Sequence, residues 1–234
     1  MFKHLTVILA FLMTLSSPVA AQDFQKGSDA YSAGDYATAL QEWKPLAEAG
    51  NVDAQFNLGL MYYNGEGVLQ DYKEGIKWYR LAAEQGDASA QYNLAIKYDD
   101  GKGVPLDDKE AIKWYRLAAE QGHAKAQFNL GIMYDNGEGV IQDYVEAAKW
   151  YRLAADQDVA KAQLNLGIMY EYGQGVLQDN TMAHMWYNIA SANGHEKAGG
   201  YRDERAGLMT NADISKAQAM ARECMSSGYT KCGY

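Results

Sequence analysis

Cysteine, proline and positive charge are all scarce in this chain. Only two Cys and three Pro occur among the 234 residues, and no Pro- or Ser-rich linker divides them. Cys224 and Cys232 are too far apart for a Cys-x-x-Cys redox motif. The chain has 21 Lys and Arg against 30 Asp and Glu. Because nucleic acid binding needs clustered positive charge, this balance argues against it.

Long apolar runs are absent except at the N-terminus. Lys3 and His4 precede an apolar run over 5–15, and small residues follow over 16–21. This pattern predicts a secretory signal over residues 1–21, with Gln22 first in the mature chain. The alternative, a membrane anchor, is disfavoured because the run is too short to span a bilayer. We therefore expect an exported protein, periplasmic or secreted, without membrane insertion. Loss of Lys3 leaves 20 basic residues against 30 acidic ones, a net charge of about -10.

The two cysteines are expected to form a disulfide, since export places them in an oxidising compartment. Cys224 and Cys232 would then close a small loop at the C-terminal end. Two free thiols on a frayed tail are the alternative. Neither interpretation indicates redox catalysis.

What the chain does contain is a repeat of 36 residues. The Ala-Gln-x-Asn-Leu pattern starts at Ala54, Ala90, Ala126 and Ala162, and tryptophans keep the same step at Trp78, Trp114, Trp150 and Trp186. A fixed period in this range indicates a solenoid, in which each unit buries its apolar face against its neighbours. Such a molecule has an extended surface rather than a single deep cleft, which favours binding over catalysis.

Each unit reads as two helices, A and B. Helix A, over 53–64 in the first unit, ends at a glycine pair such as Gly65 and Gly67. Helix B follows an aspartate such as Asp71, which predicts an N-cap, and Glu74 three residues later predicts a capping box. The aromatic and alanine residues of helix B are expected to form the core between units.

The two ends of the repeat array differ from its middle. Residues 22–50 read as a shorter capping pair, in which Trp43 lies 36 residues before Tyr79 and takes the Tyr position. Four repeats then occupy 51–194. Residues 195–234 form a C-terminal cap and tail, with closing helices expected over 198–209 and 211–226. The sequence thus predicts about twelve helices and no strand.

The repeat resembles the Sel1-like repeat, a relative of the tetratricopeptide repeat. The shared pattern is Ala-x-x-x-Leu-Gly-x-x-Tyr-x-x-Gly-x-Gly-Val, then Asp, then Trp-Tyr-x-x-Ala-Ala; it covers about 23–193, and Ala95 and Asp158 replace glycines. The resemblance implies an all-α, right-handed α-solenoid that serves as an adaptor in protein complexes. It also implies, for exported bacterial members, roles in envelope assembly, exopolysaccharide secretion, signalling or host contact. One cysteine-rich branch is associated with β-lactam binding, but this chain lacks the disulfide within each repeat that marks that branch.

Motifs for catalysis are missing from the sequence. It contains no Ser-x-x-Lys, Gly-x-Ser-x-Gly or His-Glu-x-x-His, and no phosphate-binding loop. His123 and His195 occupy equivalent turns of different repeats, whereas His184 lies within a helix B. A metal site needs several such ligands to converge. We therefore expect no catalytic, cofactor or metal site.

The inner face of the solenoid is the candidate binding surface, by analogy with tetratricopeptide repeats. Amide side chains offer donors and an acceptor to a peptide backbone, and apolar columns beside them offer buried area. An equally weighted alternative is that the amides bridge helices, and for Gln55, Gln91, Gln127 and Gln163 that structural role is favoured. The predicted groove residues are Phe56, Asn57, Leu60, Tyr92, Asn93, Ile96, Phe128, Asn129, Ile132, Leu164, Asn165 and Ile168.

Acidic residues gather near the ends of helices A, at Asp99, Asp100, Asp135 and Glu171. They could give the groove a negative rim that attracts a basic partner, or form an ordinary solvated face. The sequence therefore predicts an exported, monomeric, non-enzymatic scaffold that binds a basic or apolar protein or peptide. The alternatives are an envelope hydrolase or β-lactam-interacting protein, and a purely structural spacer.

Overall fold

The computed structural model describes residues 23–233, so the predicted signal over 1–21 lies outside the described residues. Within 23–233 the chain forms twelve helices and no strand, as predicted. The helices are α1 (Phe24–Ser32), α2 (Tyr36–Glu48), α3 (Val52–Asn64), α4 (Tyr72–Glu84), α5 (Ala88–Asp100), α6 (Asp108–Glu120), α7 (Ala124–Asn136), α8 (Tyr144–Ala155), α9 (Ala160–Tyr172), α10 (Asn180–Ala192), α11 (Ala198–Ala206) and α12 (Asn211–Ser226).

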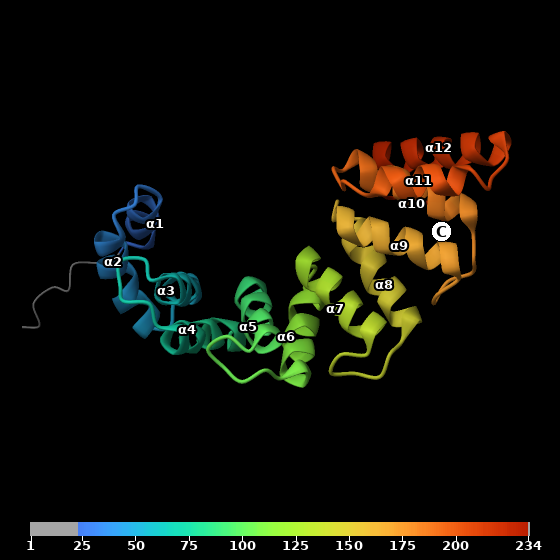
Figure 1. Ribbon diagram of the computed structural model, residues 1–234. Coiled ribbons are helices and arrows are strands. Elements are labelled where there is room, and N and C mark those ends of the chain that lie inside the picture. The colour runs from blue at the N-terminus through green and yellow to red at the C-terminus, as the bar shows by residue number, and fades with distance from the viewer. Residues whose placement is uncertain (1–22, 234) are drawn as a thin grey trace, which may run out of the picture.

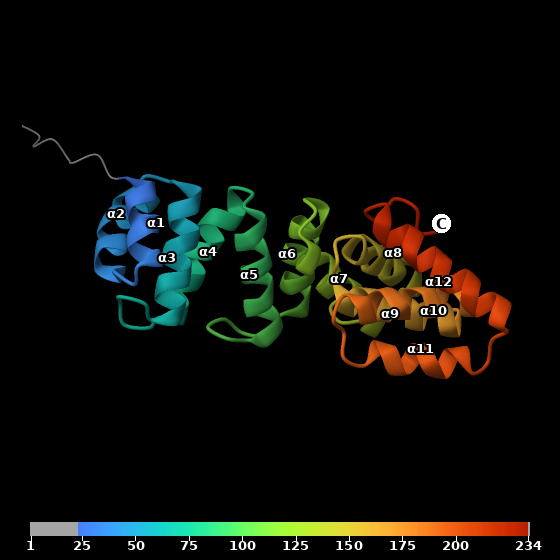
Figure 2. The same cartoon turned by 90° about the horizontal axis from the view of Figure 1, so that it is seen from above.

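The helices pair in sequence order and the pairs stack into a solenoid. Each helix A (α3, α5, α7, α9) packs against the helix B that follows it and against the helix B before it. The pairs follow one another along a curved path, with α1 and α12 at opposite ends (Figures 1 and 2). Contacts are therefore made mainly between consecutive helices, as in other repeat proteins.

The loops between helices A and B depend on two glycines. Gly173 ends α9 in the left-handed conformation with φ 68°, and its N–H donates to the carbonyl of Met169. Gly175 lies so close to the start of α8 that an added Cβ would stand 2.0 Å from the Tyr144 carbonyl oxygen. The first glycine thus turns the chain, and the second lets the loop contact the preceding unit.

Aspartate caps every helix B, but the predicted capping box is only half formed. The Asp71 carboxylate accepts from the N–H groups of Lys73 and Glu74, at 2.9 and 3.0 Å. The reciprocal bond is absent because the Asp71 N–H donates instead to the Tyr62 carbonyl at 2.8 Å. The Glu74 side chain pairs with Lys77, 3.0 Å away. At Asp107 and Asp143 the backbone N–H likewise donates to a tyrosine carbonyl of the preceding helix, and the glutamate three residues later pairs with a lysine.

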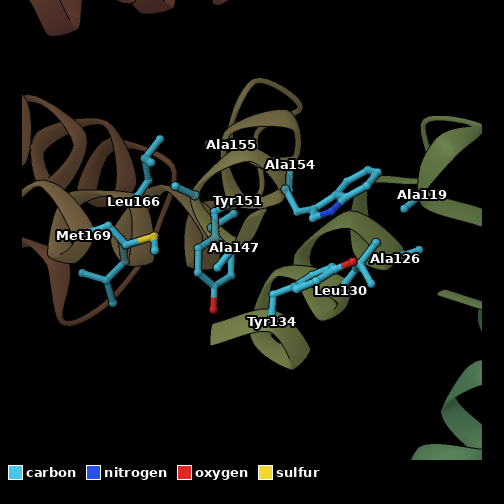
Figure 3. Packing of buried hydrophobic residues seen from close by; sticks show 14 of the residues in the cluster. Ala119, Ala126, Leu130, Tyr134, Ala147, Tyr151, Ala154, Ala155, Leu166 and Met169 are labelled. Carbon is cyan, nitrogen blue, oxygen red and sulfur yellow. The ribbon is translucent and has the colours of Figure 1, made fainter. Parts of the chain in front are cut away.

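The core is built on a tyrosine of helix B that packs against a small residue of helix A. A Cβ added to Gly131 of α7 would lie 2.6 Å from a ring carbon of Tyr151. Figure 3 shows Tyr151 between side chains of α7 and α9, and it is fully buried. In the N-terminal pair Trp43 takes this place, since it packs on Gly27 in the same way. The prediction that Trp43 fills the tyrosine position is confirmed.

A second column of buried glutamines ties three successive helices together. The Gln127 Nε2 donates to the Ala119 carbonyl of α6 at 3.0 Å, and its Oε1 accepts from Gln157, in the turn that follows α8, at 2.8 Å. Equivalent bonds to the preceding helix are made by Gln55, Gln91 and Gln163. The structural role predicted for these glutamines is confirmed.

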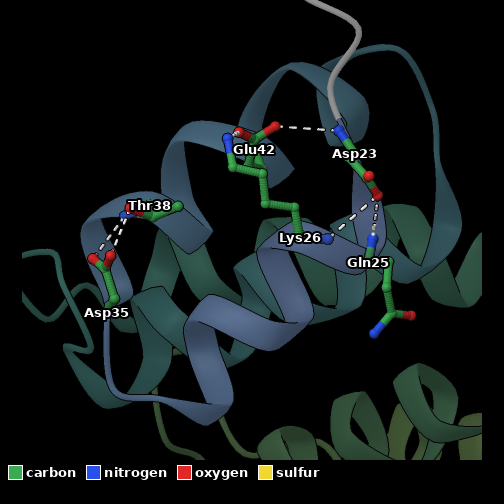
Figure 4. A network of polar contacts seen from close by, with 6 residues as sticks. All are labelled: Asp23, Gln25, Lys26, Asp35, Thr38 and Glu42. Atoms are coloured by element: carbon green, nitrogen blue, oxygen red, sulfur yellow. Dashed lines mark hydrogen bonds and ion pairs between the residues drawn. The ribbon is translucent and has the colours of Figure 1, made fainter.

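A polar network closes the N-terminal end. The Asp23 carboxylate caps α1, and the backbone N–H of Asp23 donates to the Glu42 carboxylate of α2 at 3.1 Å (Figure 4). Lys26 pairs with the same carboxylate at 2.5 Å. Asp35 caps α2 through the Thr38 N–H at 3.1 Å. The two contacts with Glu42 hold the start of α1 against α2.

The C-terminal end is closed by a helix that leaves the repeat pattern. The helix α11 ends at Ala206 rather than at the predicted Met209, and α12 packs against α10. As a result Met185 and Ile189 of α10 are fully buried, whereas the equivalent Lys149 and Leu153 of α8 are exposed. The sequence of α10 is more apolar because α12 covers it.

A disulfide between Cys224 and Cys232 holds the tail on this cap. Both cysteines are buried. Tyr229, within the closed loop, accepts from the Asn193 Nδ2 at 2.8 Å and donates to Asp158. The loop thus reaches the end of the glutamine column, at the place where a further repeat would otherwise begin.

Replacement of Trp114 by Ala should lower stability strongly. Trp114 is 6% exposed, and removal of such a large buried side chain typically costs about 3–5 kcal/mol. The measurement is the thermal melting temperature by circular dichroism. Lys113→Ala, an exposed neighbour, is the control and should change it little. Equal melting temperatures for Trp114→Ala and the wild type would contradict the core assignment.

Removal of the disulfide should loosen the C-terminal cap and leave the repeats folded. In the loop-entropy model a ring of this size contributes about 2–3 kcal/mol, and repeat units depend chiefly on their neighbours. Hydrogen exchange of a Cys224→Ala, Cys232→Ala variant should accelerate in α12 and not in α5 to α8. Uniform acceleration along the chain would contradict a local role. Free-thiol titration of unreduced wild type should find almost none.

Candidate binding groove

An open pocket is shared by three successive helices A. Its volume is about 490 Å³, and no helix B residue lines it. Since the intervening helices B do not contribute, the helices A must converge on one side of the solenoid, where they form a groove. The lining residues are Phe56 of α3, Ser89, Tyr92 and Asn93 of α5, and His123, Ala124 and Lys125 at the start of α7.

A second pocket lies two units further along the chain, between α9 and the start of α11. Its volume is about 550 Å³. Leu164, His195 and Lys197 occupy the positions equivalent to Tyr92, His123 and Lys125 in the first pocket. The complete lining is Lys161, Leu164, Gly194, His195, Glu196, Lys197 and Tyr201. The groove therefore presents related sites at intervals along its length.

The predicted groove residues all lie on helices A, at different depths. Phe56, Tyr92 and Asn93 line the first pocket, and Leu164, which is buried, lines the second. The others line neither pocket but are half-buried, at equivalent positions of successive helices: Asn57, Leu60, Ile96, Phe128, Asn129, Ile132, Asn165 and Ile168.

The aromatic residues of the groove pack on the buried tyrosines of helices B. These tyrosines, here called the tyrosine column, are Tyr79, Tyr115, Tyr151 and Tyr187. The ring centroids of Tyr92 and Tyr115 are 6.0 Å apart, and those of Phe128 and Tyr151 are 5.9 Å apart. One face of each groove ring is thus packed, while the side chain as a whole is half-buried. Rings held in this way lose little conformational freedom when they contact a partner.

The asparagines make bonds within the protein. The Asn129 Nδ2 donates to the Tyr115 hydroxyl at 3.0 Å. The Asn93 Nδ2 donates to the Ser89 carbonyl at 2.8 Å. Because an amide carries two N–H groups and an acceptor oxygen, each asparagine has capacity left for a partner. These residues can therefore bridge helices and still contact a bound chain.

Most of the acidic residues near the ends of helices A accept hydrogen bonds from the tyrosine column. Tyr115, Tyr151 and Tyr187 donate their hydroxyls to Asp99, Asp135 and Glu171, at 3.0, 3.1 and 2.5 Å. Glu171 also pairs with Arg205 of α11. Burial raises the pKa of Asp99 and of the three tyrosines. Three of the four acids predicted to form a negative rim thus have structural partners.

The three histidines among residues 23–233 lie at different places in the fold. His123 caps α7, because its Nδ1 accepts from the Ala126 N–H at 3.2 Å, and it stacks on Tyr92 with centroids 4.5 Å apart. His195 lines the second pocket, and His184 is buried in α10. Among residues 23–233 no cluster of His, Cys, Asp or Glu is arranged to hold a metal ion.

A row of lysines is the feature that sequence reasoning missed. Lys125, Lys161 and Lys197 recur at the 36-residue step and line the two pockets. The signal was present in the sequence, since Lys125 and Lys161 fall at the start of a helix A and Lys197 precedes α11 at the same step. The excess of acidic residues over the whole chain hides this local row of positive charge.

Comparison with known families identifies the repeats. The Sel1 repeat model matches residues 52–87, 88–123, 124–159 and 160–195, more than half of the chain. The chain belongs to the Sel1 repeat family. Sel1 repeat proteins generally act as scaffolds for protein interaction, and their fold is typically non-enzymatic.

Two solved structures resemble this Sel1 repeat protein closely. A Sel1 repeat protein from Oxalobacter formigenes is 31% identical with a TM-score of 0.75, over 91% of this chain and 93% of that one. The protective antigen c5321 of uropathogenic Escherichia coli, which has an SLR fold, is 32% identical with a TM-score of 0.76. That match covers 90% of this chain but spans only 50% of the antigen. No curated protein sequence matches the chain.

A fall in pH should destabilise the repeat capped by His123. Burial lowers the pKa of His123, and its capping bond requires an unprotonated Nδ1. The unfolded chain binds the proton more readily, so this contribution is complete above about pH 6.5 and is lost as the pH falls through the lower folded value. Replacement by Asp, the residue that caps the equivalent α5 at Asp87, should reduce this loss.

The measurement is the difference in melting temperature between neutral and mildly acidic buffer, for wild type and for His123→Asp. Other titrating groups, including the buried His184, are common to both proteins and cancel in the comparison. Identical pH dependence in the two proteins would show that the His123 cap does not contribute.

Proposed function

We propose that this Sel1 repeat protein is an exported scaffold that binds a segment of another protein along the groove formed by its helices A. The observation that carries the proposal is the pocket shared by α3, α5 and α7, with a related pocket two units on. An open groove with recurrent apolar and amide side chains suits an extended or helical peptide rather than a small enclosed substrate.

The groove combines buried area with hydrogen-bonding capacity. Tyr92, Phe128 and the isoleucines at 96 and 132 supply half-buried apolar surface, which gains free energy when a partner covers it. The amide oxygens and remaining N–H groups of Asn93 and Asn129 can pair with a peptide backbone. Because the repeats present these groups at regular intervals, binding energy would be distributed over several units.

Export is part of the same proposal. It is supported by the charged start, apolar run and small residues within 1–21, and by the buried Cys224–Cys232 pair, which suits an oxidising compartment. No helix among residues 23–233 is long and apolar enough to cross a membrane. The periplasm and the extracellular medium both fit these features.

Polar substitutions in the groove should weaken binding of the partner. The partner is first recovered from an envelope extract with the mature protein, and its affinity is then measured by calorimetry. Ile96→Gln with Ile132→Gln should reduce affinity by roughly tenfold or more, because two apolar contacts lose their burial. Circular dichroism must show that the variant is folded.

The matched control places the same change on helices B. Leu81 and Leu117 are 37% and 38% exposed and line neither pocket. Leu81→Gln with Leu117→Gln should leave affinity unchanged. If the control pair lowers affinity and the groove pair does not, the partner binds the outer face and the groove model is wrong.

A further inference from the structure

The lysine row of the groove, Lys125, Lys161 and Lys197, makes no ion pair with an acidic residue of the described part of the chain. The exposed lysines of helices B, such as Lys77 and Lys113, pair with a glutamate one turn away. Among residues 23–233, no ion pair involves any lysine of the row. All three side chains are exposed at the edge of the groove. They are therefore available to a bound molecule.

Positive charge at this edge stands out against the rest of the chain. The formal net charge of the whole sequence is -9, yet the lining of the first pocket contains one charged residue, Lys125, and no acidic residue. The second pocket has two lysines of the row and one acid, Glu196. The acids Asp99 and Asp135 lie at the opposite ends of helices A and hold tyrosine hydroxyls.

Each lysine of the central repeats shares a helix face with a groove asparagine. Lys125 and Asn129 are four residues apart on α7, and Lys161 and Asn165 are four residues apart on α9, so each pair lies on one face. An ammonium group and an amide N–H side by side can both donate to one carboxylate. The helix dipole favours an anion at this end of the helix as well.

We propose that the groove selects an acidic segment that also carries apolar side chains. Its carboxylates would contact the lysine row, and its apolar side chains would lie on Tyr92, Phe128 and Leu164. This inference rests on the proposed groove function and adds the chemical class of the partner. It replaces the basic partner that the acidic residues suggested from sequence.

The experiment is selection of a random-sequence peptide library displayed on phage against the mature protein. The inference expects enrichment of Asp or Glu together with Leu, Ile, Val or Phe. Enrichment of Lys and Arg, or of apolar residues without acidic ones, would overturn the inference and leave groove binding intact. A library that shows no enrichment would overturn the proposed function itself.

A charge-neutralising variant tests whether the lysine row is responsible. Lys125→Gln with Lys161→Gln should reduce the acidic enrichment, and weaken binding of a selected acidic peptide by roughly threefold or more, as expected for two exposed ion pairs. Lys73→Gln with Lys109→Gln makes the same charge change at exposed positions of α4 and α6 and should have no such effect. Equal losses in both variants would attribute the preference to net charge and contradict the lysine row.

Discussion

The fold depends on one recurrent contact, a tyrosine ring of helix B pressed against a residue of helix A that is glycine or alanine. The Tyr151 ring occupies the space that a side chain at Gly131 would take. The contact sets how closely the two helices approach, and in Tyr115, Tyr151 and Tyr187 the hydroxyl also bonds to an acid of the preceding helix. Through Tyr115, α6 is joined both to Asp99 of α5 and to Asn129 of α7. Repetition of this unit propagates the solenoid.

The same contact explains why the candidate site lies on helices A. The tyrosines fill the space between helices, and the groove rings rest on them from the other side. Asparagines and acids next to the tyrosine hydroxyls, such as Asn129, Asp99 and Asp135, form hydrogen bonds with them that join neighbouring helices. What is left for a partner is the half-buried apolar surface, the remaining amide capacity and the unpaired lysine row. The groups that can bind a partner are therefore those that make no contact needed for the fold.

Much of the fold could be predicted because it follows from local rules applied four times. The period, the glycine-ended helices and the Asp caps all derive from short-range chemistry, and even Trp43 could be placed by counting residues. The predicted reciprocal bond of the capping box, from the Asp71 N–H to the Glu74 side chain, does not form. The Asp71 N–H donates instead to the Tyr62 carbonyl of the preceding helix. The roles of Asn129 and Asp99 depend on side chains brought together by three helices, which no single-repeat pattern contains. The apolar sequence of α10 is explained by its packing against α12, a contact that the repeat pattern does not contain.

If the groove is the binding surface, a partner contacts helices A and not helices B. The most direct measurement is photo-crosslinking in the cell of origin, with a photoreactive amino acid placed either at Ile132 in the groove or at Leu117 on helix B. We expect an adduct of defined mass from position 132 and none from position 117. An adduct from position 117, with none from position 132, would contradict this expectation.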